Sequence, residues 1–382
     1  MRLGDCGKTN LHTYSDKEKW SLIRYLDTGS ITEGRIDEIQ TLYPGVDKIP
    51  SRARRKASVG DILFSTVRPN QKHYGIIEAG TENLLVSTGF TVVTVDTTIA
   101  DPYFIYYYLT QSSVIESLQA IAEQSTSTYP SIKPSDIEDI ELDLPELETQ
   151  KKIGSTLRML DRKIALNEEI NDNLQQQVAA LFANFYDRAE TEVGFTEIIQ
   201  ILGGGTPKTG ESSYWNGNVP FFTPKDVGSP YTLATEKTIT EEGLAHCNSR
   251  LYPVNTVFVT ARGTVGKVGL PGIPMAMNQS CYALVGKDTH QLLVYFYTLK
   301  AVDRLKHKAS GAVFDAITTR DFESEIIMKL SDDDEKAFLD VAQPIYQAVL
   351  SNSIENLRLA ALRDSLLPKL MSGEIDVSGV QL

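Results

Sequence analysis

The sequence is poor in the residues that build disulfide frameworks, metal centres and membrane spans. Its 382 residues include three cysteines and five histidines. Cys6, Cys247 and Cys281 are odd in number and far apart, which argues against a disulfide framework or a structural zinc site, and the histidines never pair at ligand spacing. No apolar run reaches the roughly 18–20 residues of a membrane span. The N-terminus lacks an apolar signal core, so we expect a cytoplasmic protein with no membrane partner.

Motifs for covalent chemistry are missing as well. The run Gly203-Gly204-Gly205-Thr206-Pro207-Lys208 resembles a phosphate loop, but Pro207 replaces the glycine that this loop needs before its lysine. Asp101-Pro102-Tyr103-Phe104 lacks the second proline of the amino-methyltransferase motif, and we interpret it as a helix start with Pro102 in the first turn. No Ser/His/Asp set and no paired carboxylates stand out. We expect no catalytic residues, no metal and no cofactor in this chain.

The charge of the chain is unevenly distributed. The net charge of −13 argues weakly against nucleic acid as a partner. Residues 51–72, however, carry six basic side chains against one acidic one, while residues 132–148 carry one basic side chain against seven acidic ones. Because the local field matters more than the total charge, basic loops of an acidic protein can still bind phosphate.

A heptad stripe occurs twice in the sequence. Its steps alternate between four and three residues, which is the spacing of a coiled coil. The first stripe consists of Ile153, Leu157, Leu160, Ile164, Asn167, Asn171, Leu174, Val178, Leu181 and Phe185. The second consists of Phe338, Ala342, Ile345, Val349, Asn352, Asn356, Leu359, Arg363, Leu366 and Leu370, each 185 positions after its counterpart. We therefore expect two long helices, one in each copy of an internal repeat.

Both stripes have two asparagines at their centre. If the helices pack antiparallel, Asn167 meets Asn356 and Asn171 meets Asn352. Buried asparagine pairs cost stability but define the register, because a slipped helix leaves amides unpaired against leucine. The alternative is a long helical hairpin with no such role.

The segments between the helices also repeat. Ile62-Leu63-Phe64 parallels Val257-Phe258-Val259, and each run leads into a loop with an arginine. We predict an α+β protein with a pseudo-two-fold internal repeat, in which two similar α/β units are separated by two long helices that form an antiparallel coiled coil. The predicted segments are residues 1–145, 146–188, 189–331 and 332–382.

Polar loops at matching places in both halves carry the candidate binding residues. Arginine can bridge guanine O6 and N7, Asn or Gln can bridge adenine N6 and N7, and lysine and hydroxyl groups suit phosphate. Each residue alone is more often a solvated loop residue, but the clustering favours DNA binding. The first half offers Arg52, Arg54, Arg55, Arg68, Asn70, Gln71, Lys72 and Tyr129. The second half offers Thr206, Lys208, Lys225, Arg250, Arg262, Lys267, Asn278 and Gln279.

Several runs resemble a known family. The C-terminal run from Leu366 to Ile375, the run from Gly60 to Asn70, and Gly203-Gly204-Gly205-Thr206-Pro207 with Pro220-Phe221-Phe222-Thr223-Pro224-Lys225-Asp226 resemble motifs of Type I restriction-modification specificity (S) subunits. The resemblance covers essentially the whole chain and its two-copy order.

This resemblance implies a non-catalytic subunit with two target-recognition domains, each reading one half of a bipartite double-stranded DNA site. The coiled coil then sets the gap between the half-sites and binds two adenine methyltransferase (modification) subunits, which restriction subunits can join. S-adenosylmethionine, ATP and Mg²⁺ are expected in those partner subunits. The closing motif implies partner docking at Leu367, Pro368, Lys369 and Met371.

Two alternatives remain open at this point. The first is a coiled-coil scaffold that holds two protein partners and does not bind DNA. The second is an enzyme whose active site has no familiar motif. A gel shift with random duplexes separates the scaffold from the DNA-binding subunit.

Overall fold

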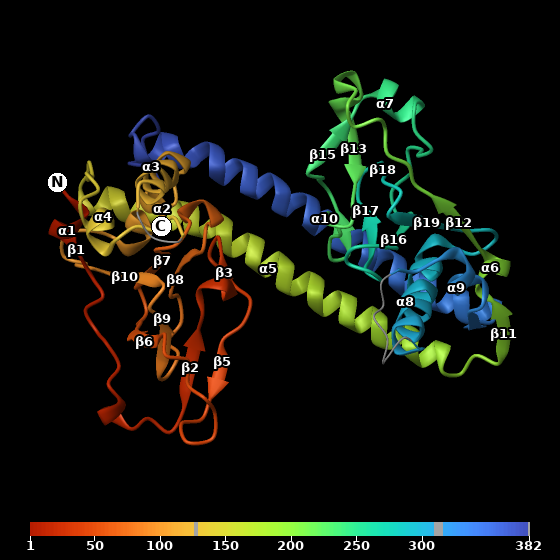
Figure 1. Ribbon diagram of the computed structural model, residues 1–382, viewed down its shortest axis with the longest axis horizontal. Coiled ribbons are helices and arrows are strands. Elements are labelled where there is room, and N and C mark those ends of the chain that lie inside the picture. The colour runs from red at the N-terminus through yellow and green to blue at the C-terminus, as the bar shows by residue number, and fades with distance from the viewer. Residues whose placement is uncertain (126–128, 309–315, 381–382) are drawn as a thin grey trace. The chain divides into compact units, whose positions relative to one another are not determined.

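The structure, a computed structural model, describes residues 1–125, 129–308 and 316–380. The chain forms two compact units, the first made from two stretches of sequence and the second from one (Figure 1). The first unit comprises Met1–Lys163 with Leu359–Leu382, and the second comprises Ile164–Arg358. Both mix helices and strands, which confirms the predicted α+β class.

The first unit contains two four-stranded sheets. One is antiparallel, in the order β1 (Gly7–Thr9), β10 (Phe90–Val95), β7 (Ile62–Ser65) and β8 (Tyr74–Ile76). The other has the order β5 (Gln40–Leu42), β2 (Ile23–Leu26), β9 (Leu84–Ser87) and β6 (Ala53–Lys56), with β2 and β9 parallel. A short ribbon pairs β3 (Ile31–Thr32) with β4 (Arg35–Ile36). Every residue of β7 is buried, which agrees with its uninterrupted apolar run.

Short helices complete the first unit. They are α1 (Leu3–Cys6), α2 (Pro102–Leu109), α3 (Ser112–Glu123) and α4 (Pro134–Glu138), with the 3₁₀ turns η1 (Asp16–Glu18), η2 (Thr28–Ser30) and η3 (Pro69–Gln71). The predicted helix start at Pro102 is confirmed, since Asp101 is the N-cap and its side chain accepts a hydrogen bond from the Phe104 amide at 2.9 Å.

The second unit repeats this arrangement with one sheet of five strands and one of three. Its main sheet has the order β12 (Ile199–Gly203), β19 (Cys281–Gly286), β16 (Val257–Thr260), β17 (Val268–Pro271) and β14 (Tyr231–Thr232). A second sheet has the order β15 (Lys237–Ile239), β13 (Trp215–Phe222) and β18 (Ala276–Met277), and β11 (Thr191–Gly194) pairs with β20 (Ile326–Lys329). The helices are α6 (Phe195–Ile198), α7 (Glu241–Ala245), α8 (Gln291–Lys308) and α9 (Thr319–Glu323), with η4 (Ser212–Tyr214).

The topology confirms the internal repeat. The order β1-β10-β7-β8 in the first unit corresponds to β12-β19-β16-β17 in the second, and the parallel pair β2 and β9 corresponds to β13 and β18. Even single bridges recur, because Val67 pairs with Ser131 in the first unit and Arg262 pairs with Ala316 in the second.

Two helices of 40 residues each follow the globular segments, α5 (Leu147–Tyr186) and α10 (Asp332–Met371). Four acidic residues in the first turn of α10 stabilise the positive end of its dipole. Among the described residues, neither these helices nor any other is long and apolar enough to span a membrane.

The two helices pack against each other in antiparallel fashion, as predicted. In the first unit, Ile153 and Leu157 of α5 share a core with Leu370 of α10. In the second unit, the ring centroids of Phe182 and Phe338 lie 5.4 Å apart. Each compact unit therefore combines one globular segment with part of both helices.

Candidate nucleic-acid interface

Strand β6 carries the N-terminal basic candidates of the first unit. It lies at the edge of its sheet, and its pairing with β9 shifts register between Ala53 and Arg55. Arg52 is exposed, whereas Arg54 and Arg55 are half-buried. Arg55 donates to the carbonyl of Thr88 at 3.5 Å, and its Nε is buried with no hydrogen-bond partner in the described structure. Desolvation lowers the pKa of Arg55, so this guanidinium is a less accessible ligand for phosphate than the sequence indicates.

A second group of candidates follows β7. Arg68 takes a left-handed conformation with φ of 48° at the start of η3, and its guanidinium lies 5.3 Å from the centre of the Tyr129 ring. Asn70 and Gln71 are exposed on η3. Lys72 follows and forms an ion pair with Glu33 at 2.5 Å. The structure thus brings together Arg68 and Tyr129, which lie far apart in the sequence.

In the second unit, Thr206 and Gln279 lie on different loops that meet. The hydroxyl of Thr206 donates to the side-chain carbonyl of Gln279. Both residues line a hollow of about 380 Å³ together with Gly204, Gly205, His246, Cys247 and Asn248. Two of the predicted candidates therefore form one site.

The remaining candidates of the second unit lie on or next to neighbouring loops. The exposed Arg262 follows β16, and its amide donates to the carbonyl of Ser280 at 3.3 Å, beside Gln279. Its loop also contacts the loop of Lys225, because the hydroxyl of Thr264 donates to the carbonyl of Pro224 at 3.1 Å. Lys225 is 3.7 Å from Glu236 in an exposed ion pair.

Four further candidates have different surroundings. Asn278 accepts a hydrogen bond from the Ser280 amide at 3.0 Å, so its side chain stabilises the turn. Lys208, Arg250 and Lys267 are exposed. Lys208 holds the neighbouring Trp215, because its carbonyl accepts from the indole N–H at 3.2 Å.

Arg68 and Arg262 lie in corresponding loops of the repeated fold, one position apart. Each loop follows the third strand of its sheet, and the residue that forms the recurring single bridge is Val67 in the first unit but Arg262 itself in the second. The parallel between the two runs therefore holds for the strands and their loops, while the two arginines are offset by one residue. Their neighbours differ, since Arg68 has the Tyr129 ring and Arg262 has the turn of Ser280.

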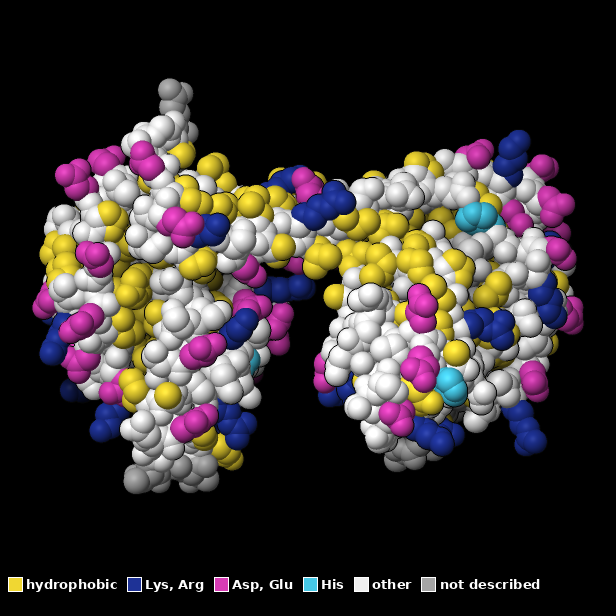
Figure 2. All heavy atoms as spheres, turned by 90° about the horizontal axis from the view of Figure 1, so that it is seen from above, with side chains coloured by type: hydrophobic (Ala, Val, Ile, Leu, Met, Phe, Trp, Pro, Cys, Tyr) yellow, Lys and Arg dark blue, Asp and Glu magenta, His cyan; other side chains and the backbone are white. Residues whose placement is uncertain are grey.

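Sequence reasoning missed His246 and Asn248. They belong to a segment without a motif, and only the fold brings them beside the glycine loop. The ring of His246 stacks on that of Tyr214, with centroids 5.1 Å apart and an interplanar angle of 15°. On the face shown in Figure 2, basic side chains are interspersed with acidic ones in both units rather than gathered in one patch.

The central asparagines of the long helices pair as the sequence predicts. The Asn167 amide donates to the carbonyl oxygen of Asn356 at 2.8 Å, and the Asn352 amide donates to that of Asn171 at 2.9 Å. All four lie in the second unit, and Asn167 and Asn171 are buried.

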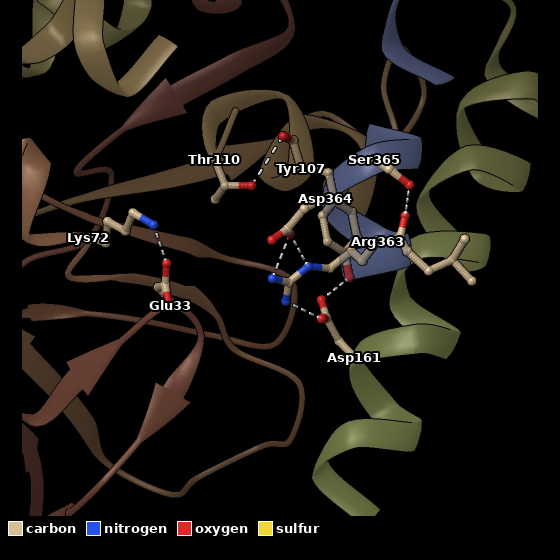
Figure 3. A network of polar contacts seen from close by, with 9 residues as sticks. Glu33, Lys72, Tyr107, Thr110, Asp161, Arg363, Asp364 and Ser365 are labelled. Atoms are coloured by element: carbon tan, nitrogen blue, oxygen red, sulfur yellow. Dashed lines mark hydrogen bonds and ion pairs between the residues drawn. The ribbon is translucent and has the colours of Figure 1, made fainter. Parts of the chain in front are cut away.

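A polar network joins the helices to the globular part of the first unit. Arg363 occupies an apolar position of the heptad stripe and donates to the carboxylate of Asp161 at 2.7 Å, while the Tyr107 hydroxyl donates to the same carboxylate at 2.5 Å (Figure 3). Burial, reinforced by this carboxylate, raises the pKa of the Tyr107 hydroxyl. These residues line a cavity of about 340 Å³.

The predicted docking residues lie beside this network. Leu367 and Met371 are half-buried and pack against the core of the first unit. Pro368 and Lys369 are exposed, and Lys369 lies 3.7 Å from Glu374. Of the four predicted docking residues, Pro368 and Lys369 are therefore the accessible ones.

Residues 53–176 and 191–335 match the family described as Type I restriction modification DNA specificity domain. These stretches make up more than half of the chain. The chain belongs to this family. The predicted membership is thereby confirmed, and each half of the chain holds one matched stretch that ends within a long helix, since the first runs from β6 into α5 and the second from β11 into α10.

The chain is similar to curated relatives over nearly its whole length or over part of it. It is 25% identical to the Type I restriction enzyme HindI specificity subunit of Haemophilus influenzae, with 98% of each chain covered. It is 29% identical to the Type I restriction enzyme EcoR124I/EcoR124II specificity subunit of Escherichia coli over 37% of each chain.

A solved structure shares the fold. The S subunit of a Type I restriction-modification system from M. genitalium superposes with a TM-score of 0.58, with 97% of this chain and 95% of that chain covered. The identity is 16%, so the likeness concerns the architecture.

Proposed function

We propose that this chain is the non-catalytic DNA-reading subunit of a Type I restriction-modification complex, in which each globular segment reads one half of a bipartite site. The observation that carries the proposal is one fold used twice with different loop residues. Arg68 and Arg262 lie one position apart in corresponding loops of the repeat, and their surroundings differ. The two copies would therefore recognise two different short sequences.

The asparagine pairs support a role for the helices in spacing. Slipping α5 against α10 by one heptad would place Asn167 opposite Val349 or Arg363, depending on the direction, and leave its amide without the Asn356 partner. The pairs would hold one register, and one register would hold one separation between the half-sites.

Partner docking has support on the outer side of the helices. Within each unit, helix residues on one side of the heptad stripe contact the globular segment of that unit, namely Asp161 with Tyr107 in the first unit and Tyr346 with Tyr231 in the second. Apolar residues on the other side of the stripe are exposed, with Leu362 at 45% in the first unit, and Ile170 at 38% and Val341 at 46% in the second.

Exposed apolar residues in heptad positions suit a helical partner. We assign this side, together with Pro368 and Lys369, to two adenine methyltransferase subunits, which would supply S-adenosylmethionine and flip the target adenine. Restriction subunits would bring ATP and Mg²⁺. Since the substrate is DNA, the complex would act in the cytoplasm.

The test is to purify the full chain with its methyltransferase partner and to sequence the methylated adenines in random DNA. The expected result is two half-sites at a constant separation. A gel shift in which neither the chain nor the complex prefers any sequence would favour the scaffold instead. A deletion of the partner serves as the control, because methylation must then disappear while any DNA binding by the chain persists.

A further inference from the structure

Three loops of the second unit form the hollow beside Gln279. They are the glycine loop after β12, the segment 246–249 and the turn 278–280. Hydrogen bonds link them, since the amide of Gly205 donates to the carbonyl of Met277 at 3.1 Å and the amide of Met277 donates to the hydroxyl of Ser249 at 3.0 Å. The hollow is therefore held by its own framework before any ligand arrives.

Two glycines are required for this close approach. A Cβ at position 204 would lie 2.1 Å from the carbonyl oxygen of Asn278, and one at position 205 would lie 2.6 Å from the amide nitrogen of Asn248. Both are shorter than any van der Waals contact. Backbone therefore packs directly against backbone at this part of the hollow.

The lining is polar and carries no formal charge from lysine, arginine, aspartate or glutamate. A phosphate site would need cations or a set of donors alone. Here donors and acceptors alternate. The Nδ1 of His246 lies 2.8 Å from the carbonyl of Glu242, and a carbonyl can only accept, so Nε2 is an acceptor in the neutral ring. Such a mixture suits the edge of a base.

A hydrogen bond from Thr206 orients the side-chain amide of Gln279. Because its carbonyl oxygen accepts from Thr206, its amide nitrogen points away from that loop with two hydrogens to donate. The carbonyl oxygen retains a second lone pair. This leaves one donor and one acceptor side by side, which match N7 and the N6 amino group of adenine, whereas guanine presents two acceptors there.

Two exposed cationic residues are close in sequence to residues that line the hollow. Lys208 stands two residues after Thr206 on the same loop, and Arg250 stands two residues after Asn248; both are exposed. Exposed lysine and arginine side chains suit contacts with phosphates.

Resting on the proposed function, we propose that Gln279, positioned by Thr206, is a specificity-determining residue that reads an adenine in the second half-site. Thr206 acts by fixing which way the amide faces. Lys208 and Arg250 provide affinity that is independent of sequence.

The first test compares sites selected from random duplexes by the full chain with its methyltransferase partner. Gln279→Glu removes the donor and leaves acceptors, so the preference at one position of the second half-site should change from adenine to cytosine, whose N4 amino group donates. The matched control is Gln200→Glu on β12 of the second unit, an exposed residue outside the hollow with the same chemical change, which should leave the second half-site as it was.

Thr206 is tested by a pair of variants. Thr206→Val removes the hydroxyl and frees the amide to turn, so discrimination between adenine and guanine at that position should fall by on the order of tenfold. Thr206→Ser keeps the hydroxyl and should keep the discrimination. Lys208→Ala should weaken binding to all sequences alike. Thermal unfolding of each variant checks that the fold is intact.

A cysteine of the chain can report on access to the hollow through its reaction with a thiol reagent. Cys247 lines the hollow and is partly exposed, whereas Cys6 and Cys281 are buried. A maleimide should react with Cys247 first, and a duplex with the selected site should slow that reaction. A duplex in which only the second half-site is scrambled should protect Cys247 from maleimide less than the selected duplex does, when it is added at a concentration that keeps it bound.

The outcomes separate the two proposals. Suppose that the wild-type complex selects a bipartite site. If Gln279→Glu and Thr206→Val then keep the same second half-site, and if DNA leaves Cys247 fully reactive, the assignment of Gln279 is overturned. The proposed function stands in that case. If the wild-type complex selects no sequence, the proposed function itself fails.

Discussion

Replacing the Asn167–Asn356 pair tests how the helices hold their register. In Asn167→Leu, Asn356 loses its 2.8 Å donor and Glu355 loses another at 2.8 Å. Asn167 is 1% exposed, so water cannot replace these bonds freely. A buried polar group left unpaired costs about 1–3 kcal/mol, and Asn356→Leu should cost a similar amount. The double variant places leucine against leucine and should be as stable as wild type or more so.

Urea unfolding of the wild type, the two single variants and the double variant measures the coupling between Asn167 and Asn356 as a double-mutant cycle. The expected coupling free energy is at least about 2 kcal/mol. Asn173→Leu is the matched control, because Asn173 is exposed on the same helix and its replacement should change stability little. If the two single effects add within roughly 0.5 kcal/mol, the pair does not hold the register. The double variant should also accept a wider range of half-site separations, and an unchanged range would count against the spacing role.

Three further substitutions test other parts of the structure. Arg262→Ala should cost on the order of 1–3 kcal/mol in binding and relax one position of the site; a uniform loss over all sequences would identify a phosphate contact instead. Arg363→Leu removes the cation that pairs with the half-buried carboxylate of Asp161 and should lower the unfolding free energy by about 1–2 kcal/mol. An unchanged urea midpoint would show that this ion pair contributes nothing to stability. Gly205→Ala should force the glycine loop away from Asn248 and weaken selection of the second half-site alone; full selection would show that the loop adapts.

The long helices and the repeat could be predicted because their signals are local and periodic. Alternating steps of four and three residues specify a helix with one apolar stripe, whatever surrounds it. The central asparagines then limit the antiparallel register to one in which amides face amides, and the observed pairs follow. The all-buried strand β7 was equally visible as an uninterrupted apolar run.

The candidate site was predicted less completely. Arg55 belongs to a basic run that looks like a solvated loop, but it lies on an edge strand and is half-buried. Leu367 and Met371 belong to the closing motif, yet they pack partly inward. In both cases the residue type is visible in the sequence, while its accessibility depends on which segments fold over it.

The amino-acid sequence alone was enough to establish two copies of one fold, two heptad helices and a choice of polar loops, because each of these depends on residues close together along the chain. Tertiary structure decided which loops meet. Thr206, His246 and Gln279 share one hollow only because the loops after β12, α7 and β18 meet in space and two glycines let the backbones touch. Contacts between distant segments depend on sheet order and close packing, and neither is written in any local pattern.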